Sequence, residues 1–124
     1  EFLKITDRKK DIIITPGGDN ISPIKIENNL NKSEFIEQSI VYGDNKPYLV
    51  SLIVISHEHK KITEEQIQQE INKINKNLSN IEKIKKFIII KDKFTIENNM
   101  MTPTLKLKRY KIIKNYKIQL EKLF

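Results

Sequence analysis

SIVYGDNKPYLVSLIVI, residues 39–55, contains two apolar runs separated by a segment of turn-forming residues. Residues 39–42 and 48–55 are rich in β-branched and aromatic side chains, which favour strands. The segment GDNKP at positions 43–47 lies between them, and Gly, Asp, Asn and Pro are typical of turns. This stretch therefore predicts two strands, which we place in a short central sheet.

Further strands and helices are predicted on both sides of this stretch. Strands are expected at 2–6, 12–15 and 87–90, with the first two paired as an N-terminal hairpin around a charged turn. One helix should begin at Ser22-Pro23 and end near Ser33, and a second should follow the capping box at residues 63–66. An irregular segment at 100–108 precedes a final helix at 109–123. The expected fold is α+β, a small mixed domain with an N-terminal β-hairpin and a short central sheet flanked by about three helices.

Two helices have apolar residues at helical spacing, which predicts the faces that they bury. The predicted faces are Ile67, Ile71, Ile74 and Leu78 in the second helix, and Ile113, Tyr116, Leu120 and Leu123 in the final helix.

Composition excludes several classes of protein. The chain has 124 residues, which suits one domain, and its 38% hydrophobic and 31% charged residues indicate a globular fold. Its apolar runs, such as those at 12–14 and 87–90, are far shorter than the roughly 18 residues of a membrane span. With no cysteine, the chain has no disulfide, thiol nucleophile or thiolate metal site.

The net charge of +7 raises the question of nucleic-acid binding. Of 23 basic residues, however, only Arg8 and Arg109 are arginine, and there is no Trp. Ile and Asn are also abundant, and with Lys they share A/T-rich codons, so coding bias accounts for much of the charge. A basic nucleic-acid-binding module stays an alternative, but we expect no nucleic-acid partner.

One histidine cluster, His57-Glu58-His59, could suggest a metal site. Residues two apart share a face only on a strand, and this cluster lies where a strand should end. No third ligand is apparent, so we expect a solvated strand end and no metal site.

Two other segments could carry chemistry. TDRKKDIIITPGGDNISP, residues 6–23, places a charged turn and a Gly-Gly break around a strand, and such backbone can approach a phosphate closely. TPTLKLKR, residues 102–109, places Lys106 between a Pro-containing stretch and a helix, where a lysine could meet developing negative charge. Taken singly, each segment is also compatible with an ordinary surface loop.

Taken together, these segments resemble the C-terminal domain of adenylate-forming enzymes. The first motif corresponds to Asp7-Arg8-Lys9-Lys10-Asp11-Ile12-Ile13, then Gly18–Pro23, then Ile26-Glu27; the second corresponds to Lys106-Leu107-Lys108-Arg109. The common form of the second motif has Ser-Gly where this chain has Thr104-Leu105. The version Thr-Pro-Thr-Leu-Lys at 102–106 resembles the long-chain fatty acyl-CoA synthetase branch. Asn99 stands where relatives often have Gly, and Asn tolerates left-handed backbone.

The resemblance implies activation of a fatty acid with ATP and Mg²⁺, followed by thioester formation with coenzyme A. It implies that Lys106 is the adenylation lysine and also contacts ATP or AMP, and that Arg8 contacts the nucleotide. Lys10 would be the hinge residue, and Gly17 and Gly18 would belong to the coenzyme A channel. Glu27 would be structural.

The resemblance also sets the expected context of the chain. Residues 1–124 would form a mobile C-terminal domain, with hairpin and hinge at 1–15 and core at 16–124, attached to a large N-terminal domain absent here. The start at Glu1, without Met or a signal peptide, leads us to expect a fragment that is inactive alone. We expect a cytoplasmic protein, and an apolar substrate is compatible with peripheral membrane contact. An adenylate-forming ligase with an aryl or amino acid substrate is the alternative within the superfamily.

Overall fold

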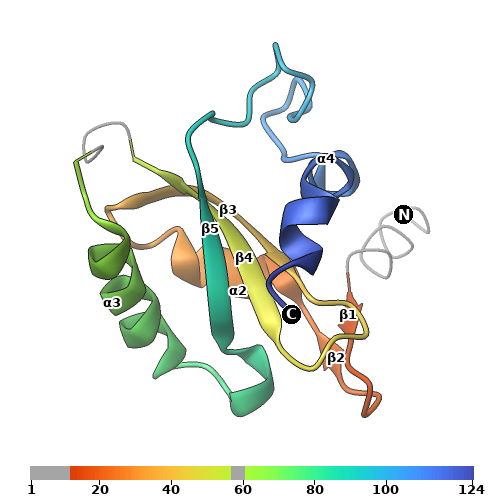
Figure 1. Cartoon of the computed structure of the whole chain (residues 1–124). Helices are drawn as coiled ribbons and strands as arrows, with labels where there is room; N and C mark the ends of the chain where they lie inside the picture. The colour runs from red at the N-terminus through yellow and green to blue at the C-terminus, as the bar shows by residue number, and fades with distance from the viewer. Residues whose placement is uncertain (1–11, 57–60) are drawn as a thin grey trace.

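The computed structural model describes residues 12–56 and 61–124. A three-stranded sheet lies at the centre, with helices on both of its faces and a small two-stranded sheet beside it (Figure 1). The predicted α+β architecture with three helices is thereby confirmed for the described part of the chain.

The central sheet has the strand order β3-β4-β5. β3 (Ile36–Tyr42) and β4 (Leu49–Ile55) form an antiparallel pair, and β5 (Ile84–Ile90) runs parallel to β4. β3 and β5 each begin three residues earlier than predicted. Six of the seven residues of β4 are buried, because it is the middle strand and both of its faces are covered.

The N-terminal hairpin differs in part from the prediction. β1 (Ile13–Ile14) pairs with β2 (Asn20–Ile21), a strand that the sequence did not indicate, around the turn that contains Gly17 and Gly18. The predicted strand at 2–6 lies outside the described residues. β1 is also fixed to the β3–β4 turn, since Ile14 N–H donates to Asp44 Oδ1 over 3.0 Å and Asn45 N–H donates to the Ile14 carbonyl over 2.8 Å.

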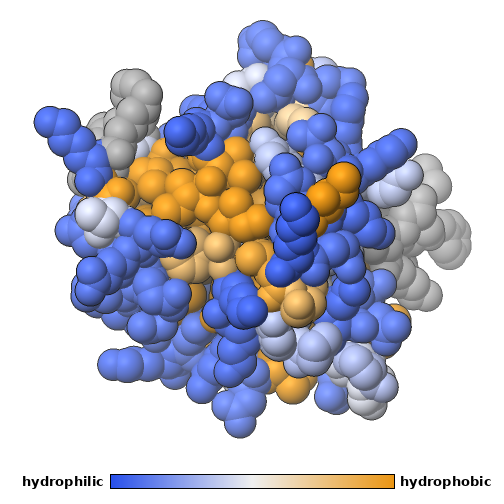
Figure 2. Space-filling model, in the orientation of Figure 1, coloured by the Kyte–Doolittle hydropathy of each residue, from blue (hydrophilic) through white to orange (hydrophobic). Residues whose placement is uncertain are grey.

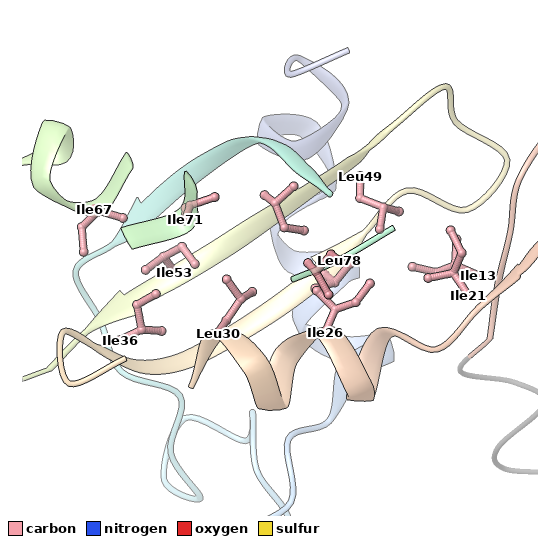
Figure 3. Close-up of a cluster of buried hydrophobic side chains, with 12 residues drawn as sticks. Ile13, Ile21, Ile26, Leu30, Ile36, Leu49, Ile53, Ile67, Ile71 and Leu78 are labelled. Carbon is pink, nitrogen blue, oxygen red and sulfur yellow. The ribbon is translucent and has the colours of Figure 1, made fainter. Parts of the chain in front are cut away.

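Helices α2 (Pro23–Leu30) and α3 (Glu64–Asn75) begin as predicted. The Ser22 hydroxyl accepts from Lys25 N–H, and Thr63 and Gln66 form the expected capping box. Their apolar residues meet on one face of the sheet, where Ile26, Leu30, Ile67 and Ile71 are fully buried (Figure 3). α3 connects the parallel strands β4 and β5, a connection that hairpin turns cannot make.

Helix α4 (Arg109–Glu121) covers the opposite face of the sheet. Of its predicted stripe, Leu120 is fully buried, and Ile113, Tyr116 and Leu123 pack at the rim of this second core. Ile112, which the prediction missed, is fully buried at the centre. The buried face of α4 is thus rotated from the predicted stripe toward Ile112, because α4 packs against β3, β4 and the segment around Phe94 together.

Gln38 fixes the segment before the second motif to the sheet. Its side-chain amide donates to the Phe94 carbonyl over 2.9 Å and accepts from Phe94 N–H over 2.8 Å. Both residues are buried, so these two backbone groups depend on Gln38 rather than on water.

Gln38→Leu is therefore expected to lower the free energy of unfolding by about 2–6 kcal/mol, because it orphans two buried backbone groups and each costs about 1–3 kcal/mol. Urea denaturation would measure this loss, with Gln69→Leu on the exposed surface of α3 as the matched control. An equal effect of the two substitutions would contradict the role of Gln38.

The C-terminal end of α4 and the residues after it are held by two tyrosines, the last residue of β3 and the residue before β4. The Tyr42 hydroxyl donates to Glu121 Oε2, and the Tyr48 hydroxyl donates to the Leu123 carbonyl over 2.7 Å. Burial, together with the Glu121 carboxylate, raises the pKa of Tyr42 to about 12.

This pKa predicts a loss of stability in alkaline solution. An unfolded tyrosine has a pKa near 10, so the contribution of Tyr42 is complete below about pH 10 and is lost as the pH rises toward 12. The stability advantage of the wild type over Tyr42→Phe should shrink across this range in denaturant titrations. Tyr110→Phe, at a residue that is 79% exposed, is the control, and a constant advantage over Tyr42→Phe would refute the prediction.

The surface has an apolar area on the side shown in Figure 2, between α3 and α4 and over the position of β5 in Figure 1. β5 is an edge strand, and residues 87–89 in its middle are only half-buried. Within the described ranges, no helix is both long enough and apolar enough to cross a membrane.

Candidate functional site

Lys106 lies in a tight turn between two short extended segments. Met101 and Leu107 form an antiparallel bridge, and Thr102 N–H donates to the Lys106 carbonyl over 2.8 Å. The Thr102 hydroxyl oxygen accepts from Lys106 N–H over 3.1 Å. The backbone of this exposed lysine is therefore fixed, while its side chain is accessible to solvent.

Leu105 adopts left-handed backbone in this turn, with φ of 65°. This is the position where the common form of the motif has Gly, which adopts such angles without a steric cost. The Leu105 side chain is 66% exposed, so packing offsets little of the strain. The structure thus explains the departure noted in the sequence: the same turn is kept, at an energetic cost. Asn99, with φ of 66°, keeps the other left-handed position as expected.

Leu105→Gly is expected to raise the free energy of unfolding by about 0.5–1 kcal/mol. Relief of left-handed strain gives about 1–2 kcal/mol, and the greater chain entropy of Gly offsets about half of it. Leu105→Ala is the control, because Ala removes the exposed side chain but keeps the Cβ that causes the strain. An equal gain from both variants in thermal unfolding would show that the backbone angle is not the cause.

A groove of about 950 Å³ lies beside this turn, between α2 and the start of α4. Cationic side chains of Lys106, Lys108, Arg109 and Lys111 line it, together with the amides of Asn28 and Asn31. Glu27 is the acidic residue of the lining, and it is paired with Arg109. The groove therefore has an excess of positive charge, which suits an anionic group such as a phosphate or carboxylate.

Glu27 and Arg109 connect the two sequence motifs. The Arg109 guanidinium donates through both terminal nitrogens to the two Glu27 carboxylate oxygens, and Glu27 also accepts from Val41 N–H over 2.8 Å. Sequence reasoning assigned Glu27 a structural role, which this geometry supports, but it did not pair Glu27 with Arg109. The sequence feature that could have indicated this pair is that each motif ends in a charged residue, Glu27 in the first and Arg109 in the second.

Gly17 and Gly18 are exposed in the β1–β2 turn. Gly18 has φ of 89°, and a Cβ placed there would meet no atom within 4 Å. The turn is closed by Gly18 N–H, which donates to the Thr15 carbonyl over 2.9 Å. Glycine is thus favoured at position 18 because of the positive φ angle and not because of crowding. The space around it is open to another molecule or domain.

Although the ion pair of Glu27 joins the two motifs, the structure keeps the Lys106 turn apart from the turn that contains Gly17 and Gly18. The start of α4 follows the Lys106 turn, whereas its end packs on the β3–β4 turn to which β1 is tied. A helix of 13 residues is about 20 Å long, and Figure 1 shows the segment before α4 and the β1–β2 hairpin on opposite sides of the domain. Arg8, Lys10 and the cluster His57-Glu58-His59 lie outside the described residues. In the remainder of the chain, no group of His, Asp and Glu could hold a metal ion.

A sequence model of the family described as AMP-binding enzyme C-terminal domain matches residues 10–124. The chain belongs to this family. The AMP-binding C-terminal domain is also 31% identical, over 99% of its length, to the long-chain-fatty-acid–CoA ligase FadD15 of Mycobacterium tuberculosis. Long-chain-fatty-acid–CoA ligase 5 of Mus musculus is likewise 31% identical over 98% of the domain. The domain spans 24% and 21% of these two relatives.

A solved structure supports the same fold. The A domain of carboxylic acid reductase from Segniliparus rugosus, in complex with AMP and a co-purified carboxylic acid, superposes with a TM-score of 0.83. The sequences are 27% identical, and the match covers 94% of this AMP-binding C-terminal domain and 20% of the reductase chain. The resemblance to long-chain fatty acyl-CoA synthetases in an adenylate-forming family is thereby confirmed.

Proposed function

We propose that the chain is the mobile C-terminal domain of a long-chain fatty acid–CoA ligase. In the first step, the fatty acid carboxylate attacks the α-phosphate of ATP, giving an acyl-adenylate and pyrophosphate. In the second step, the thiol of coenzyme A attacks the acyl carbon, and AMP leaves. The proposal follows from the ligase relatives, which the chain matches over its whole length.

The position of Lys106 is the observation that carries this proposal. An exposed ammonium on a fixed turn, beside a groove rich in cations, can meet the carboxylate and phosphate oxygens that gain negative charge during adenylation. Lysine suits this role because it is a compact charge on a long side chain that can enter and leave a site. Arg8 would add a contact to the nucleotide.

The separation of the Lys106 turn from the Gly17-Gly18 turn supports a rotation of the domain between steps. Lys106 would face the active site during adenylation, and Gly17 and Gly18 would face it during thioester formation, lining the pantetheine channel. Their positions in separate turns, one just before α4 and one between β1 and β2, are consistent with this alternation. Lys10 would be the hinge, with residues 1–15 forming the hinge and hairpin and 16–124 the rotating core.

ATP, Mg²⁺ and coenzyme A would be the co-substrates and cofactor of the whole enzyme. The described residues offer no carboxylate cluster for Mg²⁺, so phosphate oxygens and a large N-terminal domain would have to bind it. We propose a cytoplasmic enzyme, with peripheral membrane contact as a route to its apolar substrate.

Two alternatives predict different products. The likeness to the reductase A domain makes another carboxylic acid, aryl or amino, the main alternative within the family. A nucleic-acid-binding module is less well supported, because the Arg109 guanidinium is engaged by Glu27 and its side chain is only 15% exposed.

Substrate-dependent pyrophosphate release by the full-length protein would test the proposal. Palmitate, benzoate and an amino acid mixture would be compared, with and without coenzyme A, and the thioester identified by mass spectrometry. Palmitate should give pyrophosphate, and palmitoyl-CoA when coenzyme A is present. Release only with benzoate or amino acids would favour the alternative, and no release with any acid would refute an adenylating function.

A further inference from the structure

The ion pair between Glu27 and Arg109 joins three elements at one point. Glu27 lies on α2, Arg109 is the first residue of α4, and Val41 of β3 donates its N–H to the same carboxylate. The side chains are only 8% and 15% exposed for Glu27 and Arg109. A planar guanidinium that donates two parallel hydrogen bonds fixes both distance and orientation, which a lysine ammonium cannot do.

A buried ion pair is an energetically costly means of fixing the position of a helix. Burying two charges costs desolvation energy, and apolar residues of similar volume often stabilise a fold as well or better. Arg109 also lies at a helix N-terminus, where the helix dipole disfavours a cation. Among the described residues, no side chain caps the start of α4, and its first turn contains no acid. The Glu27 carboxylate supplies the missing negative charge and fixes the position of the helix start.

The backbone between Arg109 and Lys106 is short and constrained. Two residues lie between Lys106 and Arg109, and both are held: Leu107 bridges Met101, and Lys108 N–H donates to the Met100 carbonyl over 2.8 Å. Lys108 Nζ also donates to Asn99 Oδ1 over 2.6 Å. The position of Arg109 is therefore transmitted along the backbone to the Lys106 turn.

We propose that Arg109, held by Glu27, is a positioning residue for Lys106 in adenylation. It touches no reacting atom in this role. Arg109 sets the position of the Lys106 turn on the surface of the domain. It thereby sets the position of the Lys106 ammonium when the domain faces the active site. This inference rests on the proposed function, and it assigns the pair to the adenylation step alone, because Gly17 and Gly18 lie in a different turn, between β1 and β2.

The test uses the full-length protein and measures the two steps separately. The double variant Glu27→Gln/Arg109→Gln removes both charges of the pair. Adenylation is followed by pyrophosphate release with palmitate and ATP, and thioester formation by palmitoyl-CoA production from added palmitoyl-adenylate. We expect the kcat of adenylation to fall about 10- to 100-fold, as misplacement of a catalytic group by about 1 Å can cause, with KM values within about twofold. Thioester formation should stay within about twofold.

Arg109→Lys and Lys114→Gln complete the set of variants. Arg109→Lys keeps the charge but loses the bidentate hydrogen bonding to Glu27. We therefore expect an intermediate decrease in the kcat of adenylation. Lys114→Gln removes an exposed charge from the same helix and should change neither step. If the double variant does not fold by circular dichroism, Glu27→Met/Arg109→Met, with apolar side chains of similar length, takes its place.

The outcomes separate this inference from the proposed function. Unchanged adenylation in the folded double variant would overturn the positioning role, and so would an equal fall in both steps, which would indicate a purely structural pair. If Lys106→Ala left adenylation intact, the proposed function would fail, whatever the pair does. If Lys106→Ala abolished adenylation but the double variant did not slow it, only the positioning role would fail.

Discussion

Lys106→Ala in the full-length protein is expected to slow acyl-adenylate formation by about 10²–10³-fold, the loss typical when one group that stabilises developing charge is removed. Thioester formation from added acyl-adenylate should continue at a rate close to that of the wild type, because in the proposed rotation the Lys106 turn does not face the active site in this step. The fold should not change, since the Lys106 side chain is exposed and the hydrogen bonds of the turn come from its backbone. Pyrophosphate release and palmitoyl-CoA production measure the two steps.

Lys114→Ala is the matched control for this loss. Lys114 is exposed on α4 and lies outside the lining of the groove beside Lys106, so its removal should leave both steps unchanged. Loss of both steps in Lys106→Ala would indicate general damage to the domain. Adenylation by Lys106→Ala at the wild-type rate would show that Lys106 takes no part in the reaction.

Glu27→Gln is expected to lower the free energy of unfolding of this chain by about 3–5 kcal/mol. The substitution leaves the Arg109 guanidinium largely buried without its carboxylate, and breaking one half of a buried ion pair typically costs this much. The loss is a large fraction of the roughly 5–15 kcal/mol that stabilises an ordinary domain. Chemical denaturation followed by circular dichroism would measure it.

Two comparisons make this stability prediction specific. Glu97→Gln neutralises an exposed acid and should change stability by less than about 0.5 kcal/mol. The double variant Glu27→Gln/Arg109→Gln should be more stable than Glu27→Gln alone, because it also removes the buried guanidinium charge that the Glu27 carboxylate balanced. If Glu27→Gln cost no more than Glu97→Gln, the pair would not be an important support of the fold.

Local signals were sufficient to predict most of the fold. Ser22-Pro23 and the box at Thr63 mark helix starts through hydrogen bonds between residues three apart, and the structure contains both. β2 was missed because two residues, Asn20 and Ile21, give no periodicity to detect. Ile112 was missed because the orientation of α4 depends on packing against β3 and the Phe94 segment, which no local pattern records.

The site was predictable only where a motif marked it. The sequence pointed to Lys106 and to the Gly17-Gly18 turn, and the structure shows both as exposed turns. It did not reveal the left-handed angle of Leu105, although a Leu in the place of Gly was a visible clue. The contacts of Gln38 with Phe94 and of Glu27 with Arg109 join residues 56 and 82 positions apart, and one sequence without relatives does not reveal such pairs.

The attachment of α4 at both ends makes this helix a good place for a fluorescent reporter. Arg109 holds its start and Glu121 its end, so a dye on its exposed side would follow the domain as a whole. The chain contains no cysteine, and Lys114→Cys would therefore give it a single thiol for labelling. With a second dye on the proposed large N-terminal domain, energy transfer would test the proposed rotation during turnover.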